Sequence, residues 1–390
     1  MAELRAEVVI VGAGHSGLFL ACALALCGFE PVVVDPAPLR RGACKDGRHL
    51  ALLRGSRELA ERLGLWRWIA GAAFAVDRVA VWERPGGGRV VYRSEELDGL
   101  PLAYGVEHAA LRDTLSRTFA DLAGEERFVQ DRLVAIARDP DWITARLAGG
   151  MSIRARLLVG ADGRRSSVRA LAGLGARSWT YPQSALTLVV EHEQPTRGTI
   201  TEILRPGGPL ALLPLASHRS GITWVEERGR AEQLFRLGPA RLLAELARES
   251  AGLLGRSRLL QGPSLWPLGA HLAARFAQPR LLLIGDAAHG LHPIHAQGFN
   301  LAVADAGALL DLLAHDPKAA SDPGRSDVLL RYRQLREGAA RRRLFMTDLL
   351  NRIFSSDDPL LGPVRTGVLE LLAACAPLRR AAMWQGMVLH

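Results

Sequence analysis

The sequence predicts an α/β protein in which a mostly parallel sheet, covered by helices, is interleaved with a second, β-rich domain. Three apolar runs, at residues 7–12, 157–160 and 281–285, each lead into a turn and then a helical segment, as buried parallel strands do. Residues 178–272 contain strand-like runs such as SALTLVVEHE and SGITWVEE. With 390 residues, 48% of them hydrophobic, the chain can form one large or two closely joined domains.

Composition argues against several other classes of protein. The net charge is +9, but the arginines that supply it are scattered, and no basic stripe indicates a nucleic-acid partner. The apolar run at 8–27 is interrupted by three glycines and a histidine and lacks a basic leader, so we predict neither an export signal nor a membrane span there. We expect buried, reduced thiols of a cytoplasmic protein at Cys22, Cys27, Cys44 and Cys375.

The first predicted element is a strand, EVVIVG, that runs into the turn GAGHSG and the helical segment LFLACALALCG, with Gly28 at the C′ position. The turn contains a G-x-G-x-x-G made by Gly12, Gly14 and Gly17. Gly12 allows the tight turn, Gly14 lets the backbone approach a pyrophosphate, and Gly17 lets the helix pack closely on the strand.

The next strand, PVVVD, ends at Asp35, 23 residues after Gly12. An acid at this distance accepts hydrogen bonds from a ribose, and the N-terminus of the preceding helix stabilises phosphates. Because Asp35 would repel a 2′-phosphate, the segment predicts a Rossmann-like site for FAD or NAD rather than NADP. A fortuitous glycine-rich turn is the alternative, and the two flanking strands argue against it.

The second strand, LLVG, runs into the turn Ala161-Asp162-Gly163. The following RRSSVR is expected to open a helix with Ser166 or Ser167 as its N-cap. An acid beside a glycine at a strand end is common in α/β proteins, so this stretch alone indicates little about function.

The third strand, LLLIG, is followed by a segment that carries His289, His292 and His295 at every third residue. A metal site would need the three imidazoles to converge on one point. Pro293 disfavours helix at the residue before it, so the histidines are not expected to share a helix face, and no further ligand pattern is evident. We therefore predict no metal and structural roles for these histidines. The loop instead suits a planar cofactor, since Gly298 begins a helix whose dipole would stabilise the negative charge of a reduced flavin.

Together these stretches resemble one family. GAGHSG with its acid, GADGRRSSVR and GDAAHGLHPIHAQGFNLAVAD stand in the order and spacing of FAD-dependent aromatic hydroxylases of the para-hydroxybenzoate-hydroxylase-like class. Residues 46–66, GPLALLPL at 208–215 and the tail from 341 onward are most similar to the ubiquinone-biosynthesis hydroxylases. The resemblance covers essentially the whole chain. It implies a FAD-binding domain at 1–177 with 273–345, a substrate domain at 178–272 and C-terminal helices at 346–390.

The resemblance also implies roles for single residues. Gly12, Gly14 and Gly17 hold the FAD pyrophosphate and Asp35 holds the adenosine ribose. Pro293 lies beside the isoalloxazine ring and is assigned to the catalytic centre. His295 is assigned to the same centre as a candidate base, by its residue type and not by the resemblance. The other implied cofactor contacts are Arg48 on FAD, Arg112 near the diphosphate, Asp162 and Gly163 in the fingerprint shared with the nicotinamide donor, Asp286 at the ribityl region, and Gly298, Phe299 and Asn300 at the pyrimidine edge.

The sequence departs from the family at two places. His295-Ala296 replaces Ala-Gly in the H-P-x-A-G-Q-G motif, and the β-carbon of Ala296 restricts a backbone that glycine leaves free. Thr196 and Leu204 stand where histidine and phenylalanine are expected. Flavin mobility and substrate preference can therefore differ from those of the family.

The implied reaction is the hydroxylation of a phenol. A nicotinamide reduces FAD, O₂ forms a flavin C4a-hydroperoxide, and an electron-rich ring attacks its distal oxygen. A base would help to deprotonate the phenol, with His295, Tyr104 and Tyr181 as candidates, although each can equally be structural. The sequence has no second G-x-G-x-x-G, so NADPH, NADH and a separate reductase are all open as the source of electrons.

In the narrower family the substrate is a polyprenylated phenol, which needs an apolar exit to lipid, a carrier protein or a ubiquinone-biosynthesis complex. The C-terminal segment 364–390 could supply a lipid-facing or partner-facing surface and give peripheral membrane association. Ordinary helix packing is the alternative that its periodicity favours. The apolar residues concerned are Leu369, Leu371, Leu372, Met383, Trp384 and Met387.

Three other functions compete with this one. An aromatic hydroxylase of catabolism or secondary metabolism would share the same motifs. A flavin halogenase is suggested only by WRWIA at 66–70, which lacks that family's proline. A non-catalytic FAD-binding subunit of a quinone-synthesis complex would be compatible with Ala296.

Overall fold

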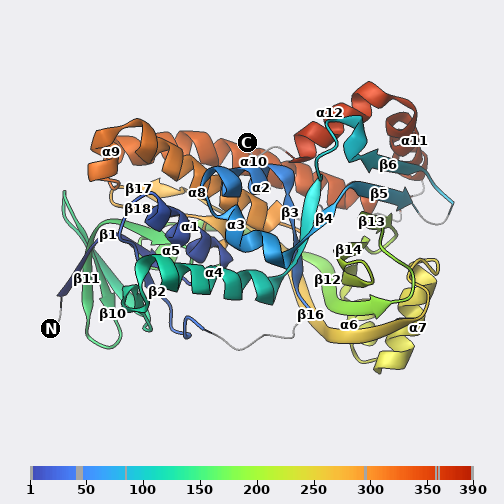
Figure 1. Cartoon of the computed structure of the whole chain (residues 1–390), viewed down its shortest axis with the longest axis horizontal. Coiled ribbons are helices and arrows are strands. Elements are labelled where there is room, and N and C mark those ends of the chain that lie inside the picture. The colour runs from blue at the N-terminus through green and yellow to red at the C-terminus, as the bar shows by residue number, and fades with distance from the viewer. Residues whose placement is uncertain are drawn as a thin grey trace.

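The described residues form three sheets and the helices around them (Figure 1). The fold is seen in a computed structural model that describes residues 3–40, 47–83, 86–293, 297–355, 358 and 361–387. The large sheets stand side by side along the molecule, and the long helix α10 (Ser326–Phe354) runs past both of them.

The first sheet confirms the predicted parallel layer. Its central strands pair in parallel, with Val9 opposite both Leu158 and Val32, and their apolar side chains are fully buried because helices cover both faces. The strand order is β17 (Ala277–Gln278), β18 (Leu281–Leu283), β11 (Ser152–Gly160), β1 (Glu3–Val11), β2 (Val32–Val34) and β8 (Phe128–Val129), with β10 (Ile143–Leu147) and β9 (Leu133–Arg138) joined through β11.

Helix α1 (His15–Leu26) packs between α4 (His108–Ala123) and α8 (Gln297–His315). It ends as predicted at Gly28, which has φ +86°. The Gly28 N–H donates to the Ala25 carbonyl and the Phe29 N–H to the Leu24 carbonyl, so two carbonyls of the last turn are satisfied. The smaller helices on this side are α2 (Arg54–Arg62), α3 (Trp66–Ile69), α5 (Ser167–Leu171) and α9 (Pro317–Ser321).

The second sheet contains the predicted strands of the substrate domain and also strands from elsewhere in the chain. β5 and β6 come from the segment 1–177, and β19 comes from the segment after 272. The chain therefore passes between the layers more often than the predicted division implies. The order is β19 (His289–Gly290), β16 (Ser257–Ala273), β12 (Ala176–His192), β15 (Arg219–Glu227), β14 (Leu210–Ala216), β13 (Thr199–Leu204), β5 (Arg78–Glu83) and β6 (Arg89–Arg93).

The two faces of this sheet have different partners, because side chains alternate along each strand. Leu186, Leu188, Ile222 and Trp224 belong to the core on the side of α6 (Arg228–Phe235) and α7 (Pro239–Glu249). Thr187 and Thr223, between them in sequence, face the opposite side, where a cavity lies. A third, small sheet joins β3 (His49–Leu53), β7 (Ala103–Glu107) and β4 (Ala73–Val76).

The C-terminal helices α11 (Leu361–Ala374) and α12 (Ala376–Met387) lie against β6 (Figure 1). Leu369, Met383 and Met387 are buried in this contact, so ordinary packing accounts for them. Leu371 and Trp384 are exposed. Within the described residues, no single helix combines the length and apolarity needed to cross a bilayer, and α11 and α12 reach that composition only jointly, across a 103° bend.

The cysteines differ in part from expectation. Cys22 is buried in α1, where burial raises the pKa of its thiol, and it forms no disulfide. Cys27 is exposed, so the prediction of burial is wrong for it, because the helix end at Gly28 turns it outward. Cys44 lies outside the described residues.

A buried carboxylate joins the parallel sheet to α8 and α10. Asp305 is fully buried, and its Oδ2 accepts hydrogen bonds from the Gly285 N–H at 2.9 Å and from His289 Nε2 at 2.7 Å. Its Oδ1 accepts from Arg336 Nε at 2.8 Å. Burial raises the pKa of Asp305, but His289 and Arg336 outweigh it, so the pKa lies below its ordinary value and the carboxylate stays ionised.

We predict that Arg336→Met lowers the free energy of unfolding by about 3–5 kcal/mol, because it leaves a buried carboxylate without its arginine partner. Denaturant unfolding of the cofactor-free protein measures this loss. The double variant Arg336→Met with Asp305→Leu should recover part of it. The matched control is Arg331→Met, an exposed arginine of the same helix, and equal effects of the two single variants would contradict the prediction.

Candidate functional site

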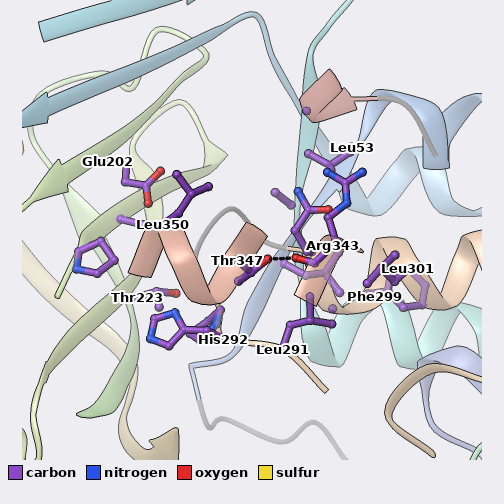
Figure 2. Close-up of a pocket in the computed structure, with 18 of the residues that line it drawn as sticks. Leu53, Glu202, Thr223, Leu291, His292, Phe299, Leu301, Arg343, Thr347 and Leu350 are labelled. Atoms are coloured by element: carbon purple, nitrogen blue, oxygen red, sulfur yellow. Dashed lines mark hydrogen bonds between the residues drawn. The ribbon is translucent and has the colours of Figure 1, made fainter. Parts of the chain in front are cut away.

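A cavity of about 1220 Å³ lies between the parallel sheet, the second sheet and the C-terminal helices. Figure 2 shows that α10 crosses it with Arg343, Thr347 and Leu350. Glu202 and Thr223 of the second sheet lie on one side of α10, and Phe299 and Leu301 of α8 on the other. The cavity therefore joins the loops of the first sheet to a chamber on the second.

The glycine turn after β1 has the geometry that its sequence predicts. A β-carbon on Gly17 would lie 1.9 Å from the Gly12 carbonyl oxygen, and one on Gly12, at φ +112°, would lie 2.4 Å from the Ala161 oxygen. A β-carbon on Gly14 would meet nothing within 4 Å, and Gly14 is exposed to the cavity at the N-terminus of α1. Gly12 and Gly17 thus serve the fold, whereas Gly14 leaves open space where an anion would contact the helix.

Asp35 lies at the end of β2, next to this turn. Its Oδ2 accepts from the Ala13 N–H at 2.8 Å, and its Oδ1 accepts from the Ala37 N–H at 2.9 Å. Arg112, on α4, reaches the same turn by donating to the Ala13 carbonyl at 3.2 Å. An acid and a guanidinium thus flank the helix N-terminus, as the ribose and the diphosphate of a dinucleotide require.

Arg48 lines the cavity at the start of β3, with its guanidinium 4.8 Å from the centroid of the Trp266 ring. His15 and His108 lie nearby, with ring centroids 3.8 Å apart. Burial and the neighbouring charges of His15 and Arg48 lower the pKa of His108 to about 2. His108 is therefore a neutral ring on the cavity wall.

The second motif has a structural task as well as a place on the cavity. Asp162 Oδ2 accepts from the Ser167 N–H at 2.6 Å and from the Val168 N–H at 3.1 Å, which fixes the first turn of α5. Ser166 is the N-cap, as one of the two predictions had it, and accepts from the Arg169 N–H. Gly163, at φ +79°, lines the cavity.

The third motif follows β18. Asp286, in the short turn η4 (Gly285–Ala287), exposes its carboxylate to the cavity, and Pro293 also lines it. Gly298 lies in the first turn of α8, where a β-carbon would meet nothing within 4 Å. Phe299 lines the cavity and makes an edge contact with His15 at 5.9 Å.

Asn300 differs from the role implied by resemblance. Its side chain is not among the cavity-lining groups and is buried against β3 and α2. Its Oδ1 accepts from the Leu53 N–H at 2.9 Å and from Ser56 Oγ at 2.7 Å, while its Nδ2 donates to the Ala51 carbonyl at 2.9 Å. It therefore holds the start of α8 in place beside β3.

Two of the three regularly spaced histidines have assignable positions. His289 is paired with Asp305, and His292 makes an edge contact with Tyr181 at a centroid distance of 5.1 Å. His295 and Ala296 lie outside the described residues. Across the part of the chain that the structure describes, no three histidine, cysteine or acidic side chains are grouped as metal binding requires.

The two tyrosines considered as bases are not at the cavity. Tyr181 donates to Asp348 Oδ1 at 2.9 Å, and burial raises its pKa to about 12. Tyr104 packs on Trp66, and burial raises its pKa as well. Neither is a cavity-lining residue, so these two candidates are wrong. Both side chains point away from the cavity, Tyr181 towards Asp348 and Tyr104 towards Trp66. The sequence pattern alone did not show which side of its strand each tyrosine occupies.

A pair of polar side chains that the sequence analysis missed does lie on the cavity wall. His49, on β3, and Thr223, on β15, both line the cavity, and Thr223 Oγ lies 3.0 Å from His49 Nε2. His49 Nδ1 lies 3.0 Å from the Gly47 carbonyl, which can only accept, so Nδ1 carries the proton and Nε2 is the acceptor. A β-carbon on Gly221 would lie 2.3 Å from the His49 ring, so glycine is needed there.

The chamber on the second sheet is mostly apolar. Ile200, Glu202 and Leu204 alternate along β13 and line it, with Val81 of β5 opposite Glu202. Glu202 is a buried carboxylate in this wall. Apolar side chains close the chamber on the side of β6 and the last three helices, and they include Val79, Leu350, Phe354, Leu369, Leu372 and Met383.

Comparison of the sequence with known proteins agrees with this geometry. Residues 5–345 match the profile of a family described as FAD binding domain. The chain is 36% identical to ubiquinone hydroxylase UbiL of Rhodospirillum rubrum, over 99% of this chain and 90% of that protein. It is 34% identical to 3-demethoxyubiquinol 3-hydroxylase of Escherichia coli, over 86% of each.

Solved structures share the fold. The p-nitrophenol 4-monooxygenase PnpA of Pseudomonas putida superposes with a TM-score of 0.80 at 21% identity, covering 99% of this chain and 98% of that one. HpxO of Klebsiella pneumoniae, solved with FAD and uric acid, gives a TM-score of 0.77 at 20% identity, covering 98% and 96%. The predicted fold class is confirmed by these two matches.

The three glycines of the first turn give a matched test of cofactor binding. We predict that Gly14→Ala folds normally but retains little FAD, because its methyl group enters space that only a ligand fills. Gly17→Ala should instead destabilise the cofactor-free protein by about 1–3 kcal/mol, because its β-carbon meets backbone. Flavin absorbance of the purified protein and denaturant unfolding separate the two effects.

The control is Gly367→Ala on α11, where a β-carbon also meets nothing within 4 Å. It should leave FAD content unchanged. Wild-type FAD content in Gly14→Ala would show that the pyrophosphate does not pass over this residue.

Proposed function

The chain belongs to the FAD-binding family of flavoprotein monooxygenases, and from that premise we propose that it hydroxylates the aromatic ring of a polyprenylated phenol in ubiquinone biosynthesis. The carrying observation is that one continuous cavity runs from the loops after the parallel strands to an apolar chamber under the last helices. A ring can lie at the first part while a hydrocarbon tail occupies the second. The two ubiquinone-pathway relatives at 34–36% identity support the same substrate class.

The residues present fit FAD. In the proposal, Gly14 and the N-terminus of α1 hold the pyrophosphate, Arg112 lies beside it, and Asp35 takes the ribose. Asp286 holds the ribityl chain, while Arg48, Gly163 and Phe299 line the path of the cofactor. Pro293 and the first turn of α8 at Gly298 border the flavin ring. The bound flavin supplies the activation of O₂, and the protein's task is to position the ring and exclude water.

Electrons come from NAD(P)H in this proposal. The sequence contains one G-x-G-x-x-G, which the FAD uses, so the nicotinamide binds without a nucleotide-binding domain of its own. A substrate with an isoprenoid tail also requires delivery from a lipid phase, a carrier or a biosynthetic complex.

His49 and Thr223 provide the base for the phenol. Thr223 donates its proton to His49 Nε2, so its oxygen is left with lone pairs that accept the phenol O–H. As the phenol proton passes to Thr223 Oγ, the Thr223 proton passes to His49, and the resulting imidazolium keeps its Nδ1–H bond to the Gly47 carbonyl. The ring then carries the negative charge that makes it electron-rich.

The substrate assignment is tested by the quinone profile of a strain that lacks the gene. We expect a prenylated phenol lacking one hydroxyl to accumulate and to disappear when the wild-type gene is restored. Mass spectrometry of the lipid extract identifies the intermediate and hence the ring position.

An unchanged quinone pool, combined with failure to complement a strain lacking a known ubiquinone hydroxylase, would contradict the proposal. Turnover of a soluble phenol in that case would favour a catabolic or secondary-metabolic hydroxylase. FAD binding without any substrate-dependent NAD(P)H oxidation would favour the non-catalytic subunit.

The base is tested by Thr223→Val, which removes the hydroxyl at nearly constant volume. We predict that the hydroxylation rate falls by about 10²-fold near neutral pH and recovers as pH rises towards the phenol's own ionisation. His49→Gln should show the same pH dependence. Product formation measured across pH in single turnovers gives both results.

Thr223→Ser keeps the hydroxyl and should restore the wild-type pH profile, which a purely structural role would not require. His218→Gln, on a hairpin outside the cavity, serves as the histidine control. A wild-type pH profile in Thr223→Val would rule out the relay.

A further inference from the structure

The lining residues that are exposed fall into two groups, from which we infer two openings that differ in chemistry. At the cofactor end, the exposed lining residues are Gly14, Arg164 and Asp286, and Pro267 of β16 is an exposed lining residue as well. At the opposite end, the lining residues that are also exposed come from the last three helices. We name this second opening the helical mouth, and its residues are Arg342, Phe345 and Met346 of α10, Val368 of α11 and Gln385 of α12.

Exposed apolar side chains gather around the helical mouth. Eight of the fourteen large hydrophobic side chains exposed by the described residues lie between residues 345 and 384, so this surface is a patch rather than a scatter. Phe345 is 64% exposed and Met346 44%. On α11, Val364, Val368 and Leu371 recur at helical spacing on one face and are each about half exposed.

The helices that form the patch are fixed to the protein by their other faces. Arg365 Nε donates to Glu83 Oε1 at 2.7 Å, and Arg379 Nε donates to Glu96 Oε2 at 2.7 Å. Leu369 and Met383 are buried beneath. The two helices therefore lie along the surface with a 103° bend between them. Their other faces are already packed against the protein, so the exposed side chains face outward in the folded state.

Two exposed arginines lie beside the patch on α10, and Glu370 is an exposed acid beside Leu371 on α11. Arg341 and Arg342 are exposed one turn before Phe345 and Met346, and neither forms an ion pair with a carboxylate among the described residues. Asp348, the acid on the same stretch of α10, is bound by Arg352 at 2.8 Å and by the Tyr181 hydroxyl. An apolar patch flanked by free guanidinium groups is the surface that binds an anionic bilayer.

We propose that the helical mouth rests on an anionic lipid bilayer, with Phe345, Val364 and Leu371 in the acyl boundary and Arg341 and Arg342 on the headgroups. The mouth then opens the cavity directly to the hydrocarbon, so that an isoprenoid tail reaches the chamber without crossing water. The route for the isoprenoid tail depends on the proposed function, which identifies the substrate. The docking on lipid depends only on the exposed residues of the surface.

Docking is tested by sedimentation of the FAD-loaded protein with vesicles of equal parts phosphatidylcholine and phosphatidylglycerol, and with vesicles of phosphatidylcholine alone. We expect the wild-type protein to bind the anionic vesicles more strongly. The double variant Val364→Glu with Leu371→Glu should weaken that binding by about tenfold or more. Arg341→Gln with Arg342→Gln should remove the preference for phosphatidylglycerol.

The matched control is Phe235→Glu with Leu171→Glu, which adds the same charge at exposed apolar residues of α6 and α5. Equal loss of binding in both double variants would overturn the assignment of this patch, and indifference of the wild-type protein to both vesicle types would overturn docking on lipid. In the latter case a protein carrier or a second copy of the chain covers the mouth.

The docking proposal and the proposed function can be contradicted independently of each other. Vesicle binding requires no turnover, so its absence would leave the hydroxylation proposal intact. Binding of vesicles without oxidation of any prenylated phenol embedded in them would contradict the proposed function alone. If both hold, Val364→Glu with Leu371→Glu should slow turnover of the embedded phenol and leave that of a short-chain, water-soluble phenol unchanged.

Discussion

The site depends on one fully buried carboxylate. Asp305 connects the turn after β18 through the Gly285 N–H, the start of β19 through His289, and α10 through Arg336. The segment 285–289 and α10 are thus both joined to α8 by one charged group, and the cost of burying that group is offset by its partners. The turn carries Asp286 to the cavity, and α10 forms its roof, so the cofactor end and the substrate chamber share this support.

The cavity changes character along its length, and this change organises the function. Near the parallel sheet it presents a helix N-terminus, backbone N–H groups and Asp286, which suit a dinucleotide. Its middle holds the His49–Thr223 pair, and its far part is lined by aliphatic side chains of β5, β13, α10 and α11. A substrate with a polar ring and an apolar tail matches this order, and the exposed patch at the far end matches a lipid phase.

The proposed base, His49 with Thr223, illustrates how a polar pair can be hidden in the sequence. His49 and Thr223 are 174 residues apart, and the sequence patterns around them assigned neither residue a role. They meet because β3 lies over Gly221, where the absence of a side chain leaves room for the imidazole ring. Tyr104 and Tyr181 looked better by residue type alone, but strand pleating turns them from the cavity, Tyr181 towards Asp348 and Tyr104 onto Trp66.

The sequence by itself determined the parallel layer, the glycine turn with Asp35 and the end of α1 at Gly28, and it narrowed the cap of α5 to Ser166 or Ser167. These features follow from short-range rules, in which backbone conformation and apolar periodicity depend on residues close in the chain. Only the tertiary structure decided that β5 and β6 join the second sheet, that the Asn300 side chain bonds β3 instead of facing the cavity, and that the exposed Phe345 borders the cavity. Each of these features depends on which distant strands and helices become neighbours. The residue pattern within one segment does not specify which other segments it will contact.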